Sequence, residues 1–237
     1  GITATSLLYR FLVKMGARVS YYIPERQSEG YGLNLEALEH IISDGASLVI
    51  TVDCGISSYD IVEAVCDRID IIITDHHTAP PQIPPARAVI NHKQPDCPYR
   101  DKNLSGVGVA FKLCQALWLR QCGEWYLDDL DIVALGTVAD VVPLVGENRI
   151  IVQAGLKKMN ELPNLGIDKL IDVAGLHDKT ITAGHIGFTL APRLNAAGRV
   201  THATRAVELL VTDDVDLAET IAQELQETNM ERQEIER

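Results

Sequence analysis

The sequence has 237 residues, 46% of them hydrophobic and 23% charged, so it has the composition of a globular protein that can bury a core. It contains no apolar run of the roughly 20 residues needed to span a membrane, and its N-terminus lacks a signal-peptide pattern, so we expect a cytoplasmic protein without membrane contact. The formal net charge of −12 argues against nucleic-acid binding through bulk electrostatics, and an anionic substrate would need bound cations or a few well-placed arginines.

Strands and helices are predicted to alternate in the first 91 residues. The strands are continuous apolar runs rather than alternating patterns, which is typical of a parallel sheet covered on both faces. The first helix ends at a glycine suited to a C-cap. The expected elements are helices at 2–16, 34–43 and 59–66, and strands at 18–23, 46–52, 69–74 and 88–91.

From residue 105 onward the pattern is almost entirely helical. The last helix places Leu217, Ile221 and Leu225 at four-residue spacing and then becomes charge-rich, which is typical of a helix that links two domains. We therefore predict an α/β fold, in which a parallel sheet with helices on both faces precedes a helical C-terminal part and a long linker helix. The catalytic core would span 1–214 and the linker 215–237. The expected helices are 107–121, 128–139, 148–161, 168–174, 183–190, 203–211 and 215–237.

Acids and imidazoles follow apolar elements at three places. Asp53 ends one apolar run, Asp75, His76 and His77 end the next, and Asp140 stands alone in a third. We expect them at consecutive strand ends of one sheet, where parallel sheets bind ligands and where a lone buried carboxylate would be costly. Mixed carboxylate and imidazole ligands suit Mn²⁺, Fe²⁺ or Zn²⁺, and a bridging carboxylate suits a binuclear hydrolase.

Each of these residues has a simpler interpretation when taken alone. Asp53 could cap the helix that follows it, the two histidines could cap a turn, and Asp140 could pair with Arg149. Their joint placement favours the metal site.

A basic group forms a second candidate site. Arg193 and Arg199 surround small residues and a glycine, so guanidinium groups and backbone amides could close on a phosphate. Arg26 follows a predicted strand and is a third candidate, although it could equally be an exposed loop charge.

Six segments in order resemble a known family. Residues 52–55, 74–77 and 136–144 resemble the second, third and fourth motifs of the DHH phosphoesterase superfamily. Residues 105–113, 146–149 and 192–199 resemble its RecJ branch, the single-strand-specific 5′ to 3′ DNA exonucleases.

The resemblance implies a two-metal phosphodiesterase that uses Mn²⁺ or Mg²⁺. Asp53 would bridge the two cations, and His76 and Asp140 would be direct ligands. Asp75 would sit at or just behind the metals and orient an imidazole, while His77 would touch the scissile phosphate. The cations would activate a water for in-line attack.

The same resemblance implies a substrate and a set of residues that bind it. Single-stranded DNA would be degraded from its 5′ end during recombination and repair, with Arg26, Arg193, Asn195 and Arg199 contacting phosphates or nucleic acid. Short oligonucleotides, cyclic dinucleotides or pyrophosphate are the alternative substrates, and a non-catalytic scaffold is a third hypothesis. Protein partners, such as a single-strand-binding protein or a helicase, are not readable from the sequence.

Two features of the family are expected outside this sequence. Members begin with a strand ending in Asp-x-Asp-x-x-Gly, of which only the end matches Gly1, and a second nucleic-acid-binding domain follows the linker helix. We therefore expect this chain alone to have weak or no metal-dependent hydrolytic activity.

Overall fold

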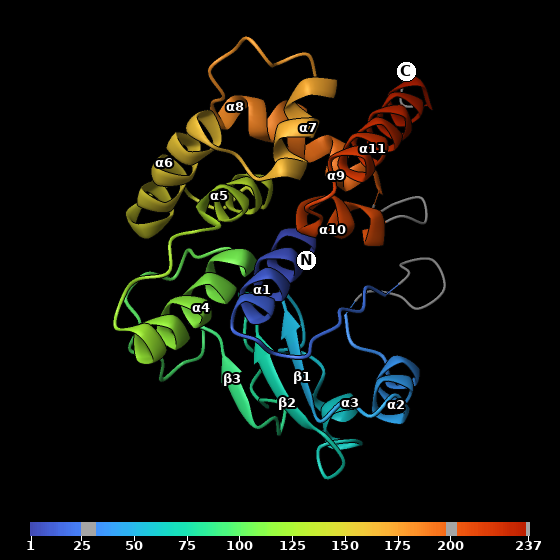
Figure 1. Ribbon diagram of the computed structural model, residues 1–237. Coiled ribbons are helices and arrows are strands. Elements are labelled where there is room, and N and C mark those ends of the chain that lie inside the picture. Colours follow the sequence, from blue (N-terminus) through green and yellow to red (C-terminus); the bar gives the residue numbers. More distant parts are fainter. Residues whose placement is uncertain (25–31, 198–202, 236–237) are drawn as a thin grey trace.

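The computed structural model describes residues 1–24, 32–197 and 203–235 (Figure 1). Its sheet has three parallel strands, β1 (Leu48–Val52), β2 (Asp70–Thr74) and β3 (Ala88–Ile90), in the order β1-β2-β3. Val52 lies opposite Thr74, and Thr74 lies opposite Ile90, so the three strands end at the same edge. Side chains that follow these strands therefore meet at that edge.

Helices cover both faces of the sheet, as predicted (Figure 1). Ile50, Val52 and Ile90 pack against the main core, which α1 and α4 help to form. Ile71 and Ile73 face a smaller core beneath α2 and α3. The helices of this part are α1 (Ile2–Lys14), α2 (Leu35–Ser43), α3 (Tyr59–Glu63) and α4 (Gly106–Cys122).

The rest of the chain is helical and shares the main core. Helix α5 is its centre, because its residues 131–137 are all buried and it packs against α1, α4 and α6. A helix that is apolar all round belongs inside a protein. The elements are α5 (Leu130–Ala139), α6 (Gly146–Glu161), α7 (Leu165–Val173), α8 (Ala183–His185), the π-helical turn η1 (Ile186–Leu190), α9 (Ala191–Ala197), α10 (Ala203–Val211) and α11 (Val215–Ile235).

Two local predictions were wrong. Residues 18–23 form no strand, and the ring of Tyr21 instead packs edge-on against Tyr9 of α1 at 5.2 Å. The sequence pattern of a short apolar run does not distinguish a segment that pairs with a strand from one that packs on a helix. Residues 191–197, which lie outside the predicted helices, form helix α9, which continues directly from η1. Pro192 therefore lies within a continuous helical stretch, two residues after the π-helical turn.

Helix α11 begins where the linker was predicted to begin. Asp214 accepts hydrogen bonds from the backbone amides of Asp216 and Leu217, which fixes the start of the helix. Its buried side chains, from Ala218 through Leu225 to Asn229, pack against the helical part. The larger part of α11 thus belongs to the same body, and the division at residue 214 remains a prediction. No helix among the described residues is long and apolar enough to cross a membrane.

Candidate metal centre

The predicted acids and histidines leave the sheet at one edge. Asp53 directly follows β1, and its backbone amide donates to the carbonyl of Thr74 at 2.9 Å. Asp75 directly follows β2, and its amide donates to the carbonyl of Ile90 at 3.1 Å. The parallel ladder thus extends one residue past each strand. Asp53 then takes a positive φ of 61°, a strained conformation for a residue other than glycine, which is typical of functional sites.

The Asp53 carboxylate lies against the first turn of α4. A Cβ added to Gly106, the first residue of that helix, would come within 2.0 Å of Asp53 Oδ1. Burial would raise the pKa of Asp53, and the hydrogen bond with His76 acts in the opposite direction and lowers it. The Asp53 carboxylate is therefore held beside an imidazole that favours its ionised form.

Asp75 organises the turn that carries the two histidines. Its side chain is 1% exposed, and Oδ1 lies 2.7 and 3.1 Å from the amides of His76 and His77 and 2.7 Å from His77 Nδ1. Oδ2 accepts a hydrogen bond from the amide of Ile56 at 3.0 Å. Both carboxylate oxygens are thus engaged by nitrogen atoms, and Asp75 fixes the orientation of the His77 ring.

His76 stands between two carboxylates. Its Nε2 lies 3.1 Å from Asp53 Oδ1 and 3.5 Å from Asp140 Oδ2. Burial disfavours the charged imidazolium, but these carboxylates outweigh it and raise the pKa of His76 above its ordinary value. The ring of His77 lies 4.5 Å from that of His76. One ligand atom each from Asp53, His76 and His77 falls within a span of 4.8 Å, so the geometry and the donor types fit a divalent cation such as Mn²⁺.

Asp140 joins this group from the helical part, which corrects its predicted location. It follows the last residue of α5 rather than a strand, and its side chain is 34% exposed rather than deeply buried. Burial raises the pKa of Asp140, and His76 only partly opposes this rise. Within the described part of the chain, its ion pair is with His76 and not with Arg149.

The capping alternative for Asp53 is wrong, because the N-cap of α3 is Ser58. His76 and His77 do lie in a turn, which Asp75 holds through their backbone amides.

The predicted phosphate-binding residues that the structure describes, Arg193 and Asn195, both belong to α9. Arg193 donates from Nε to Gln226 of α11 at 2.7 Å and from Nη1 to the carbonyl of Thr189 at 2.6 Å. Burial lowers the pKa of Arg193. These contacts tie the guanidinium group to neighbouring helices. Arg26 and Arg199 lie outside the described residues.

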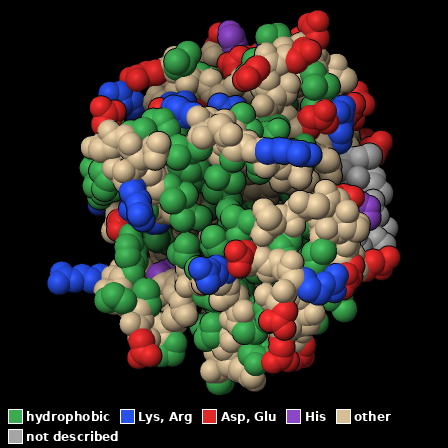
Figure 2. Space-filling view, turned by 60° about the horizontal axis from the view of Figure 1, so that its bottom comes forward, with side chains coloured by type: hydrophobic (Ala, Val, Ile, Leu, Met, Phe, Trp, Pro, Cys, Tyr) green, Lys and Arg blue, Asp and Glu red, His purple; other side chains and the backbone are tan. Residues whose placement is uncertain are grey.

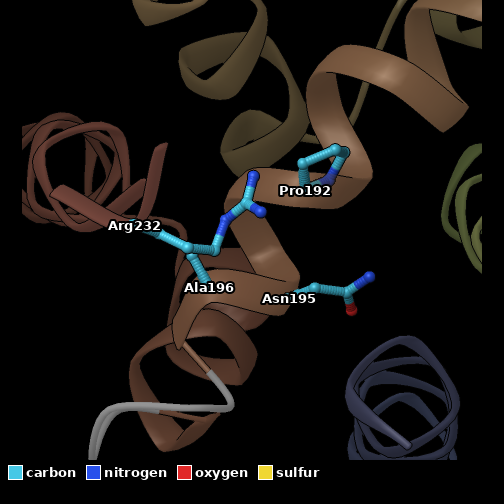
Figure 3. Close-up of a pocket in the computed structure, with 4 residues that line it drawn as sticks. All are labelled: Pro192, Asn195, Ala196 and Arg232. Atoms are coloured by element: carbon cyan, nitrogen blue, oxygen red, sulfur yellow. The ribbon is translucent and has the colours of Figure 1, made fainter. Parts of the chain in front are cut away.

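Asn195 lines an open hollow of about 200 Å³ between α9 and α11, together with Pro192, Ala196 and Arg232 (Figure 3). On the face shown in Figure 2, Lys and Arg side chains stand singly among other groups rather than forming one basic patch. Positive charge on this face is therefore local, as the overall charge suggested.

Three further residues near the centre were not predicted from the sequence. Gly106 leaves the space that Asp53 occupies. Asn91 follows β3, is 2% exposed and donates to the carbonyl of His77 at 2.9 Å. Asn148 is fully buried and donates to the carbonyls of Asn103 at 2.7 Å and Pro143 at 3.0 Å, which holds the segment after Asp140. Asn91 could have been found from its place at a third strand end, whereas the other two carry no such signal.

Comparisons with known proteins identify the family and similar chains. A family model described as "DHH family, N-terminal domain" matches residues 1–137, so Asp140 lies just beyond the matched range. The single-stranded-DNA-specific exonuclease RecJ of Bacillus subtilis is 44% identical over 236 residues, which cover 99% of this chain and 30% of that protein.

Solved structures are similar over the whole chain. A crystal structure of exonuclease RecJ bound to manganese has a TM-score of 0.91 at 36% identity, and the match covers 100% of this chain and 60% of that one. RecJ from Thermus thermophilus in complex with Mn²⁺ has a TM-score of 0.86 at 34% identity, and the match covers 100% of this chain and 34% of that one. The chain thus spans only part of the length of these relatives.

Proposed function

Because this chain belongs to the DHH family, we propose that it forms the metal-dependent phosphodiesterase core of an exonuclease that degrades single-stranded DNA. The observation that carries the proposal is the convergence of Asp53, His76, His77 and Asp140 from two strand ends and one helix end. The RecJ relatives and their manganese-bound structures support the choice of substrate and cation.

Each residue has a distinct role in the proposed mechanism. Asp53, His76 and Asp140 would hold two divalent cations, Mn²⁺ or Mg²⁺. When bound, the cations would supply an activated water and neutralise charge on the phosphate. His77, oriented by Asp75 at 2.7 Å, would hydrogen bond to the scissile phosphate. Asp75 therefore acts by positioning, since donors already occupy both of its oxygens.

The proposal also covers how the single-stranded DNA is bound and where in the cell the protein acts. Arg26, Arg193, Asn195 and Arg199 would contact the nucleic acid and favour attack from the 5′ end. Residues 1–214 would form the core, and 215–237 would begin a link to a second domain. A DNA substrate implies action in the cytoplasm during repair and recombination.

The test uses the full-length protein, because this chain alone is expected to have weak or no activity. It compares single-stranded oligonucleotides labelled at the 5′ or the 3′ end in the presence of Mn²⁺. We expect release of the 5′ label first, dependence on the cation, and at least a hundredfold lower rate in Asp53→Asn, since this change removes a charged ligand. Asp168→Asn, on α7, is the control and should be unaffected. Unchanged activity in Asp53→Asn would contradict the proposal. Cleavage of dinucleotides but not of long single strands would show that the enzyme acts on the alternative, short substrates.

A further inference from the structure

Phe188 is exposed in a way that the other phenylalanines are not. The chain has three phenylalanines. Phe11 and Phe111 are 0% and 2% exposed, whereas Phe188 is 89% exposed. Single exposed apolar side chains are common, so exposure alone carries no meaning. Phe188, however, lies in the π-helical turn η1, and such turns are frequent at functional sites.

The turn that carries Phe188 packs against the helix that ends at Asp140. A Cβ added to Gly187 would lie 3.7 Å from Val138 of α5, two residues before Asp140. Val141, the residue after Asp140, is 88% exposed and has a φ of 58°. Among the described large hydrophobic side chains, Val141 and Phe188 are the two most exposed, and both belong to elements beside the candidate metal centre.

The same helical face continues from Phe188 to the hollow. Phe188, Pro192 and Asn195 follow one another at spacings of four and three residues along η1 and α9, so they share a face. Pro192 and Asn195 line the hollow with Arg232 of α11 (Figure 3). The guanidinium of Arg232 donates to the buried Asn229 at 3.1 Å, which fixes it at this place.

An exposed ring on η1, together with an amide and a guanidinium at the neighbouring hollow, matches the chemistry of a single-stranded nucleic acid. Bases stack on aromatic rings whatever their sequence, and phosphates pair with arginine. The position beside the metal centre favours this occupant, because a strand held for hydrolysis must continue past the scissile phosphate. In a chain with a net charge of −12, a local cation such as Arg232 matters for holding a phosphate.

We propose that Phe188, Asn195 and Arg232 form a binding surface for single-stranded DNA, in which a base stacks on the Phe188 ring and a phosphate meets Arg232. This inference rests on the proposed function and adds to it the surface along which the strand runs. The Phe188 ring supplies most of the contact with bases, and the Arg232 guanidinium supplies the part of the binding free energy that depends on salt.

The test uses an oligonucleotide that contains 2-aminopurine, whose fluorescence is quenched by stacking, with EDTA present so that the strand is not cut. Phe188→Ala should bind about tenfold more weakly and lose quenching, Phe188→Leu should behave like it, and Phe188→Trp should restore both. Leu162→Ala removes another exposed apolar side chain and should bind like the unaltered protein. Arg232→Gln should weaken binding and reduce the salt slope by about one.

Two results would overturn the inference. Unchanged binding and quenching in Phe188→Ala would exclude stacking, and full binding by Phe188→Leu would show an apolar cover rather than a base platform. The proposed function fails separately, if the full-length protein neither binds Mn²⁺ nor hydrolyses the small diester bis(p-nitrophenyl) phosphate. Hydrolysis of that diester with unchanged strand binding in Phe188→Ala would reject this surface alone.

Discussion

At the scale of single residues, Asp75 shows how one buried carboxylate sets the geometry of a site that it does not itself fill. Its oxygens accept hydrogen bonds from three backbone amides and contact one imidazole nitrogen. An asparagine keeps one acceptor oxygen and turns an amino group towards these donors. We expect Asp75→Asn to lower the free energy of unfolding by about 2 to 3 kcal/mol, measured by urea denaturation, and to weaken Mn²⁺ binding in calorimetry.

A matched control lies on the surface. Asp172 Oδ1 contacts His177 Nδ1 at 3.0 Å, but the two side chains are 36% and 76% exposed. Asp172→Asn should change stability by less than about 0.5 kcal/mol, because solvent replaces an exposed contact. If the two substitutions had equal effects, burial would not explain the importance of Asp75.

Gly106 makes a second prediction at this scale. A Cβ there would stand 2.0 Å from Asp53 Oδ1, so Gly106→Ala must displace either the carboxylate or the start of α4. We expect at least a tenfold loss of Mn²⁺ affinity in calorimetric titration. Gly184→Ala should have no such effect, because its nearest neighbour would be 3.6 Å away. Unchanged affinity in Gly106→Ala would show that the start of α4 moves and that the Asp53 carboxylate keeps its place.

These two residues mark the limit of what the sequence could predict at the site. The residues Asp53, Asp75, His76 and His77 could be singled out because each follows an apolar run at a predicted strand end. Gly106 could not, because its role depends on a contact between segments far apart in the chain. A glycine in a helical pattern carries no sign of what fills the space beside it.

At the scale of elements, the start of α6 secures the segment that follows Asp140. Asn148 is fully buried and joins Pro143 to Asn103 through two hydrogen bonds. Asn148→Ala should lower the free energy of unfolding by about 1 to 2 kcal/mol, because it removes two part-buried hydrogen bonds that a fully buried side chain donates. It should also weaken Mn²⁺ binding, since Asp140 is three residues from Pro143.

Asn160, on the same helix, provides the comparison. Its Nδ2 donates to the carbonyls of Leu156 and Ile181 at 2.7 and 3.0 Å, and no described contact joins it to the metal centre. Asn160→Ala should reduce the melting temperature and leave Mn²⁺ affinity unchanged. Loss of affinity in both variants would mean that general loosening, rather than the Pro143 segment, controls the site.

The elements also show why some sequence predictions were right and others wrong. The long helices and strands β1 and β2 follow from sustained apolar patterns, and the structure has them within a few residues of the predicted bounds. The strand predicted at 18–23 is absent because an apolar pattern of six residues does not show whether the segment pairs with a strand or packs against a helix. Residues 191–197 lie outside the predicted helices, since a proline inside a helical pattern usually ends the helix, but they form α9 directly after η1.

At the scale of the whole molecule, the metal centre joins two structural parts. Asp53 and His76 come from the sheet, whereas Asp140 comes from the helical part, and all three meet within hydrogen-bonding or ion-pair distance. A cation held between them would cross-link these parts in the folded state. Unfolding would separate the ligands, so the cation should bind the folded state far more tightly.

Mn²⁺ should therefore raise the stability of the folded protein. At a cation concentration of about 100 times the dissociation constant, one site adds about 2.7 kcal/mol. For a chain of this size, that corresponds to a rise of roughly 5 to 10 °C in melting temperature. The shift should be absent in Asp53→Asn and should persist in Asp168→Asn when thermal unfolding is followed by circular dichroism. An equal shift in Asp53→Asn would place the stabilising cation elsewhere, because no carboxylate would then remain at the end of β1 to hold it.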